Sequence, residues 1–291
     1  MRRPVLSVVI ANYNYGRFLE DAIQSVVGQN ENGVVELIVC DAASTDDSVE
    51  IIKRYADRIS WWCSEKDGGQ SAAFNKGFSH AKGRFFTWLN ADDWFAPNAL
   101  RTVLRHIEQY PDCEWFAGGE CRVDARGKIL RFDRNRSFQR IRAECGELQP
   151  NGPSSFFSRA LYERAGGYVD ESFHYAMDIE LWERFYFQAH ARFRKVPGYI
   201  WMFRAHEASK TAAEEAGVVR PHDESNVAWF RRQAECRLIK EKYAKHTLTL
   251  WRRFLSLSPF ENIMSRFDTM RYCGEDWRTF FPEKNARLGV I

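Results

Sequence analysis

The chain has 291 residues, with 42 basic and 39 acidic side chains, a net charge of +3 and 45% hydrophobic residues. A chain of this length and hydrophobicity can bury a large core, which excludes a disordered protein. The even charge balance excludes the one-sided basic surface of a dedicated nucleic-acid-binding protein, so we expect no nucleic-acid partner.

Predicted strands and helices alternate through residues 1–110. Residues 5–11 are almost continuously apolar, as in a buried strand, and residues 18–27 have the apolar spacing of a helix. A second strand is predicted over 34–40, followed by a helix that Ser44 or Thr45 can cap. Further strands are predicted at 59–63 and 84–89, and further helices at 71–81 and 97–110. This alternation predicts an α/β fold with a mostly parallel sheet covered by helices.

The alternation ends after residue 111. A hairpin, an irregular polar loop, two helices and a last strand are predicted at 114–132, 133–155, 159–165, 177–189 and 193–200. From residue 208 the chain is charged and mainly helical by pattern. We therefore predict one domain over 1–207, with a nucleotide-binding half (1–110) and an acceptor and catalytic half (111–207). The segment 208–291 is predicted to be a helical C-terminal extension.

Polar residues follow each of the first four predicted strands, at Asn12–Asn14, Asp41–Ser44, Glu65–Gln70 and Asn90–Asp93. We call these polar segments strand tips. A single one could be an ordinary turn, in which Asp and Asn are common, but four at the carboxyl edge of one sheet indicate a ligand site. No phosphate-binding G-x-x-x-x-G-K-[ST] loop is present, and no G-x-G-x-x-G turn follows the first strand. The site is therefore neither a P-loop nor a dinucleotide fingerprint.

The side chains at these tips suit a nucleotide and a cation. Asp41 could accept hydrogen bonds from a base, and Tyr13 could stack on a ring. Asp92 and Asp93 suit Mg²⁺ or Mn²⁺, which prefer carboxylate, phosphate and water oxygens. Adjacent carboxylates after a buried strand are costly without a positive partner.

The chain resembles family 2 glycosyltransferases with the GT-A fold. The resemblance covers about residues 5–210. Its motifs, in chain order, are Ser7–Ile10 with Asn12–Asn14, Asp41–Asp46, Ser64–Gln70, Asn75–Gly77, Trp88–Asp93, Gln149–Pro150 with Phe156–Phe157, Gly166–Asp170, Met177–Trp182 and Arg204–His206.

The resemblance implies a set of site residues. The nucleotide would lie over the first strands, with Asp41 near the base and Asp92 as the metal-binding carboxylate. His206 would complete the metal site, although a lone histidine is more often structural. Asn90 stands where many relatives have aspartate, which removes one negative charge. The nucleotide-binding residues implied in this way are Ala11, Tyr13, Asp41, Asp67, Gln70 and Asn90.

The resemblance also implies that Asp178 is the catalytic base. An inverting transfer needs a carboxylate to take the proton of the acceptor hydroxyl. The alternative for Asp178 is helix capping, and Glu180 is a weaker candidate for the base because it points to another side of the helix. Lys76 and Arg204 are candidates to meet a diphosphate, with solvated surface charge as the alternative for each.

These residues predict an inverting glycosyltransferase that uses a UDP-sugar and Mg²⁺ or Mn²⁺. The resemblance implies an acceptor that is a saccharide or lipid-linked hydroxyl in bacterial cell-surface polysaccharide or lipopolysaccharide synthesis. A nucleotidyltransferase and a non-catalytic sugar-nucleotide-binding protein of the same fold are the alternatives. Asn90 is the only support for the second, and the first would need a basic loop after the first strand.

Location is predicted from the cysteines and from the C-terminal segment. The seven cysteines are odd in number and contain no C-x-x-C pair, which favours a reduced, cytoplasmic setting. No apolar stretch of about 18 residues is present, so the chain should not span a membrane by itself. Basic and aromatic residues after 227 fit peripheral contact with the inner face of the plasma membrane, or an ordinary packing helix.

Overall fold

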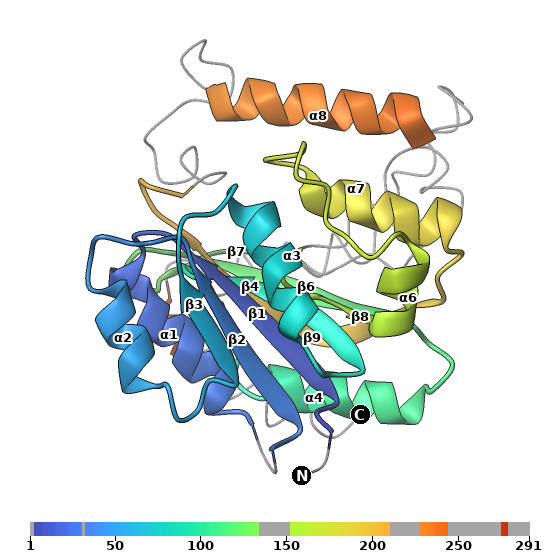
Figure 1. Ribbon diagram of the computed structural model, residues 1–291. Coiled ribbons are helices and arrows are strands. Elements are labelled where there is room, and N and C mark those ends of the chain that lie inside the picture. Colours follow the sequence, from blue (N-terminus) through green and yellow to red (C-terminus); the bar gives the residue numbers. More distant parts are fainter. Residues whose placement is uncertain (1–2, 31–32, 134–151, 210–226, 244–274, 279–291) are drawn as a thin grey trace.

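The computed structural model describes residues 3–30, 33–133, 152–209, 227–243 and 275–278, which form a central sheet with helices on its faces (Figure 1). Its strands are β1 (Leu6–Asn12), β2 (Val35–Asp41), β3 (Trp61–Ser64), β4 (Phe85–Asn90), β5 (Trp94–Phe95), β6 (Trp115–Asp124), β7 (Ile129–Asp133), β8 (Ser155–Ser158) and β9 (Phe193–Ala205). Its helices are α1 (Gly16–Val27), α2 (Ser48–Arg54), α3 (Gln70–His80), α4 (Ala99–Gln109), α6 (Arg159–Arg164), α7 (Met177–Glu183), a π-helical turn (Arg184–Gln188) and α8 (Val227–Tyr243).

The strand order β3-β2-β1-β4-β8-β6-β9-β5, with β7 beside β6, divides the sheet into two parts. The strands β3, β2, β1 and β4 are parallel, as the alternation of strands and helices predicts. Beyond β4 the sheet is mixed, because β8 runs antiparallel to both β4 and β6, whereas β6 and β9 are parallel. The mixed part brings β9 and the segment before α7 to the same side of the molecule as the tips of β1 and β4.

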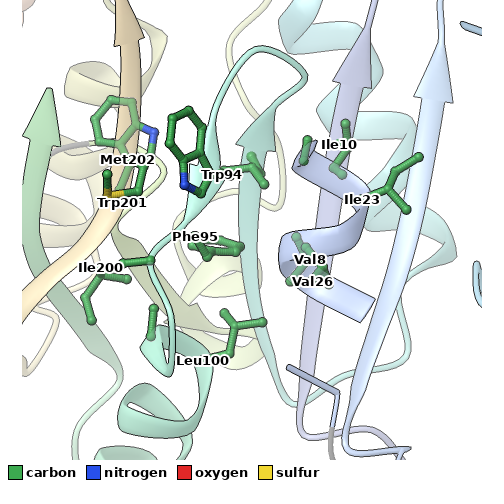
Figure 2. Packing of buried hydrophobic residues seen from close by; sticks show 14 of the residues in the cluster. Val8, Ile10, Ile23, Val26, Trp94, Phe95, Leu100, Ile200, Trp201 and Met202 are labelled. Carbon is green, nitrogen blue, oxygen red and sulfur yellow. The ribbon is translucent and has the colours of Figure 1, made fainter. Parts of the chain in front are cut away.

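The core lies on both faces of the sheet because successive residues of a strand point to opposite faces. On one face Val8 and Ile10 of β1 pack against Ile23 and Val26 of α1 (Figure 2). On the other face Val9 belongs to a second cluster with residues of α3 and α7. Burying each such side chain stabilises the fold by roughly 1.5–3 kcal/mol. The two-sided burial explains why the strand predicted over 5–11 is continuously apolar.

The helix α3 approaches the sheet closely because Gly77 faces β1. A Cβ atom at this position would lie 2.3 Å from Cγ1 of Val9, closer than any non-bonded contact allows. The close packing holds the first residues of α3, which follow the tip of β3, near the tips of β1 and β4.

Several predicted boundaries are corrected by the structure. Ser44 and Thr45 do not cap α2, because its N-cap is Asp47 and makes no side-chain capping bond. The strand predicted over 193–200 extends to Ala205, and the helix predicted over 177–189 changes to a π-helical turn after Glu183. The short strands β5 and β8 are not predicted from the sequence.

Parts of the predicted organisation lie outside the described residues. Most of the predicted loop 133–155 and most of the extension after residue 208 are among them. Within the described chain, no helix has the length and apolar character needed to cross a membrane.

Candidate functional site

A cavity of about 720 Å³ lies at the carboxyl edge of the parallel strands. The register pairs Asn12 with Asp41 and Ala11 with Asn90, so the tips of β1, β2 and β4 lie side by side. Seven of the predicted site residues line this cavity: Ala11, Tyr13, Asp67, Gln70, Asn90, Asp92 and Asp178. The convergence predicted from the strand tips is therefore present in the structure.

Asp41 does not line the cavity and is only 1% exposed. Its Oδ1 accepts hydrogen bonds from Nδ2 of Asn12 at 2.6 Å and from Oγ of Ser44 at 2.5 Å. Its Oδ2 accepts from the Ser44 N–H at 3.0 Å and from Oγ of Ser64 at 2.5 Å. Asp41 thus ties the tips of β1, β2 and β3 together beneath the cavity. Contact with a base stays a prediction.

Asn90 is held between two polar side chains. Its Oδ1 accepts from Nε2 of Gln70 at 2.8 Å, and its Nδ2 donates to Oδ2 of Asp93 at 2.8 Å. An aspartate at position 90 has no N–H to offer and would face Asp93 with a second negative charge. The asparagine is therefore the residue that suits this arrangement chemically.

The neighbours Asp92 and Asp93 point in different directions. Asp93 is 1% exposed, and its Oδ1 accepts the backbone N–H of Arg204 at 3.0 Å. Burial, followed by the charge of Asp92, raises the pKa of Asp93 well above its usual range. Asp92 lines the cavity, so it is the carboxylate of the pair that a cation can reach.

His206 stands behind Asp92 rather than on the cavity wall. Its Nε2 lies 3.1 Å from Oδ2 of Asp92, and the ring is 1% exposed. Its Nδ1 accepts the Ala208 N–H at 3.2 Å, so the neutral ring carries its proton on Nε2 and donates it to Asp92. To bind a cation through Nε2, the ring would have to move this proton to Nδ1.

The donor set therefore fits a divalent cation through Asp92. His206 can orient the carboxylate from behind, as partners of metal ligands commonly do. Among the described residues, no group of three or more His, Cys, Asp or Glu side chains could hold a metal ion by itself. A bound cation would need further oxygen ligands from a substrate or from water.

Asp178 reaches the cavity from the first turn of α7. Burial raises the pKa of its carboxyl group, and the charge of Arg232 on α8 opposes this effect. Its Oδ1 accepts the N–H of Ile179 at 2.8 Å, so the carboxylate satisfies one first-turn N–H group and still borders the cavity. The capping alternative and a chemical role are thus compatible.

Glu180, the weaker candidate for the base, and Lys76, a candidate to meet a diphosphate, both pair with other residues. Glu180 is fully buried and accepts from Nε of Arg184 at 2.8 Å and from the hydroxyl of Tyr243 at 2.8 Å. Lys76 forms an ion pair with Glu65 at 2.7 Å. Neither Glu180 nor Lys76 lines the cavity.

Arg204 is also directed away from the cavity. Its guanidinium lies 4.4 Å from the ring centre of Phe18 and 4.5 Å from that of Trp94, and it pairs with Asp21 at 2.6 Å. Lys66 does line the cavity. It belongs to the motif Ser64–Gln70, but no role was predicted for it from the sequence.

Sequence reasoning missed most of the wall opposite the strand tips. These lining residues come from the segment before α7, from β9 and from the loops beside them: Gly152, Pro153, His174, Tyr175, Trp201, Phe203 and Ser209. No local pattern marks them, because they meet the strand tips only through the mixed half of the sheet.

Comparison with known proteins identifies the family and the fold. The family model described as "Glycosyl transferase family 2" matches residues 7–165. An uncharacterized glycosyltransferase of Rickettsia typhi is 28% identical over 190 residues, covering 62% of this chain and 58% of the relative. One of Mycobacterium tuberculosis is 30% identical over 182 residues, covering 61% and 67%. The chain thus spans less than two thirds of the length of the R. typhi relative.

Two solved structures share the fold. S. aureus TarS 1–349 in complex with UDP-GlcNAc superposes with a TM-score of 0.59 at 15% identity, covering 83% of this chain and 68% of TarS. The mannosyltransferase PcManGT from Pyrobaculum calidifontis, in complex with GDP-Man and Mn²⁺, gives a TM-score of 0.55 at 17% identity, with 94% and 85% covered. The fold is GT-A, as the resemblance implies.

Proposed function

The chain belongs to glycosyl transferase family 2, and on this premise we propose that it is an inverting glycosyltransferase. It would move a sugar from a nucleotide-diphosphate donor to an acceptor hydroxyl. The observation that carries the proposal is that Asp92, at the tip of β4, and Asp178, in α7, line one cavity although 86 positions separate them in the sequence. This reaction needs two carboxylates. One binds the cation that stabilises the departing diphosphate, and the other takes the proton from the acceptor hydroxyl.

Asp178 is proposed to accept the proton of the acceptor hydroxyl as that oxygen attacks the anomeric carbon. The bond to the diphosphate breaks on the opposite side of the sugar, through an oxocarbenium-like state. The raised pKa of Asp178 suits this task, since a base works best when its pKa lies closer to the working pH. Tyr175 and Met177 line the same cavity as Asp178, and they are proposed to hold the acceptor and exclude water.

Asp92 is proposed to hold Mg²⁺ or Mn²⁺ together with diphosphate oxygens. His206, whose Nε2 lies 3.1 Å from Oδ2 of Asp92, is proposed to complete this metal site. When bound, the cation would offset negative charge on the departing diphosphate. Ala11, Tyr13, Asp67, Gln70 and Asn90 are proposed to bind the nucleotide, because they line the side of the cavity formed by the parallel strands.

The donor is proposed to be a UDP-sugar and the acceptor a saccharide or lipid-linked hydroxyl of a bacterial surface polysaccharide. The TarS and PcManGT complexes support the general kind of donor, since both hold a nucleotide-diphosphate sugar. The division at residues 110 and 207 and a cytoplasmic setting at the inner membrane face remain parts of the proposal. Cys40, Cys63, Cys113 and Cys121 are free thiols, which suits that setting.

A thermal-shift screen tests the donor. UDP-, GDP- and dTDP-sugars are added with and without Mn²⁺, and the UDP-sugar with Mn²⁺ is expected to raise Tm by several degrees. A ligand at 100 times its Kd stabilises the native state by about 2.7 kcal/mol. A larger shift in Tm with GDP-sugars would show that the donor nucleotide is GDP and not UDP. The absence of a shift with every sugar nucleotide would contradict the proposed function.

The pH dependence of kcat provides a second test. Asp178 acts as a base only when ionised, so kcat should fall as the pH drops through its pKa, which burial raises. Arg232 lowers this pKa and Glu235 raises it. R232Q should therefore move the acidic limb of the kcat profile to higher pH, whereas R237Q, on an exposed part of the same helix, should leave it in place. An acidic limb that does not move in R232Q contradicts the assignment.

A further inference from the structure

One carboxylate on α8 binds three consecutive backbone N–H groups just before α7. Oε1 of Glu235 accepts from the N–H of His174 at 3.0 Å, and Oε2 accepts from the N–H groups of Tyr175 and Ala176 at 2.8 Å each. Hydrogen bonds to an ionised acceptor are roughly twice as strong as neutral ones. The segment 174–176 is thus bound to a helix about 60 residues further along the chain.

Of these three N–H groups, that of Ala176 is one of the first N–H groups of α7, which find no carbonyl within their own helix. Ala176 is the N-cap and has no side chain that can cap. Asp178 satisfies the N–H of Ile179 but not that of Ala176. Glu235 therefore caps the Ala176 N–H from α8 and also binds the two residues before it.

A second contact fixes α8 against α7, which lies below it in Figure 1. Nζ of Lys242 and the hydroxyl of Tyr243 donate to Oε1 of Glu180, at 3.1 and 2.8 Å. Ile239, between the two contacts, is 2% exposed. Glu235, Ile239 and Tyr243 are four residues apart, so they lie on one face of the helix. The packing-helix alternative therefore describes this part of the C-terminal extension.

The bound segment leads directly to the proposed base. His174, Tyr175, Met177 and Asp178 all line the cavity, and the segment 174–176 enters α7 two residues before Asp178. We propose that Glu235 is a positioning residue for sugar transfer: it holds residues 174–176 so that Asp178 and the adjoining wall face the acceptor. The proposal rests on the proposed function, because it gives the segment a role in that reaction.

Hydrogen–deuterium exchange and kinetics test the proposal on the full chain. In E235A the amides of residues 174–176 should exchange faster, and kcat should fall roughly 10- to 100-fold, since a small misplacement of a reacting group has an effect of this size. The donor Kd, measured by calorimetry, should change less than about twofold, because the donor residues lie on the parallel strands. A general structural defect would weaken donor binding as well.

E235Q and E241A serve as the graded variant and the matched control. The glutamine keeps one carbonyl acceptor but loses the charge, so E235Q should lie between wild type and E235A in both exchange and kcat. Glu241 is exposed on the same helix, and E241A should behave as wild type. If E235A does not fold, E235Q decides by the same two measurements.

The outcomes separate this proposal from the proposed function. Unchanged exchange at residues 174–176 in both Glu235 variants overturns the anchoring, whatever the activity. Faster exchange with wild-type kcat overturns the positioning role. A wild-type chain that transfers no sugar from any donor overturns the proposed function, and with it a role for Glu235 in catalysis, while the exchange result still tests the anchor.

Discussion

Replacing Asp178 with asparagine is expected to lower kcat by about 10²- to 10⁴-fold, the range that a positioned general base contributes. Asparagine has nearly the same shape, and its carbonyl oxygen can still accept the N–H of Ile179 that Oδ1 accepts now. The variant should therefore fold normally and bind the donor with little change. Initial rates of UDP release in the presence of acceptor, together with calorimetric donor titration, provide the measurement.

A matched control uses an acidic residue outside the cavity. D57N removes one exposed carboxylate near the end of α2 and should keep wild-type rates. If D178N keeps kcat within about threefold of wild type, Asp178 is not the base. If D178N loses donor binding as well, its role is structural rather than chemical.

Asp92→Ala is expected to abolish the part of donor affinity that depends on Mn²⁺. Loss of a group that only orients a metal ligand lowers metal affinity about 10- to 100-fold, so loss of the ligand itself should cost more than about 100-fold. The nucleotide contacts proposed for Tyr13 and Gln70 should persist. Calorimetric titration of the donor with Mn²⁺ and with EDTA separates the two contributions.

The same titration contains its control. Wild-type protein in EDTA should resemble D92A in either buffer, because both lack the cation at this position. If Mn²⁺ strengthens donor binding in D92A as much as in wild type, Asp92 is not the metal ligand. The fold should be retained, since Asp92 borders the cavity, whereas the buried carboxylate of this pair is Asp93.

The sequence predicted the parallel half of the sheet well because its signals are local. Residues 5–11 and 34–40 are short apolar runs bounded by polar residues, and both are buried strands in the structure. It missed β5 because a strand of two residues carries no detectable period, and it missed β8 because this strand begins at the end of the predicted polar loop 133–155. The cap predicted at Ser44 was wrong because this hydroxyl bonds Asp41 instead.

The candidate site was predictable in its positions but not in its partners. Parallel strands end at one edge, so polar residues after them had to converge, and Asp92 and Asp178 do line one cavity. Which side chains face that cavity depended on contacts between distant segments. Asp41 accepts a hydrogen bond from Asn12 beneath the cavity. Arg204 contacts two aromatic rings and pairs with Asp21.

The order of the strand tips and the polar residues that follow them can be read from the sequence, because apolar runs and turn residues act over a few neighbouring positions. That Asn90 donates to a buried Asp93, and that Glu235 binds the segment before α7, can be read only from the folded chain. A hydrogen bond needs two atoms within about 3 Å, and a buried charge needs a partner. Those conditions are met only when residues far apart in the chain are brought together by the packing of the sheet and α8.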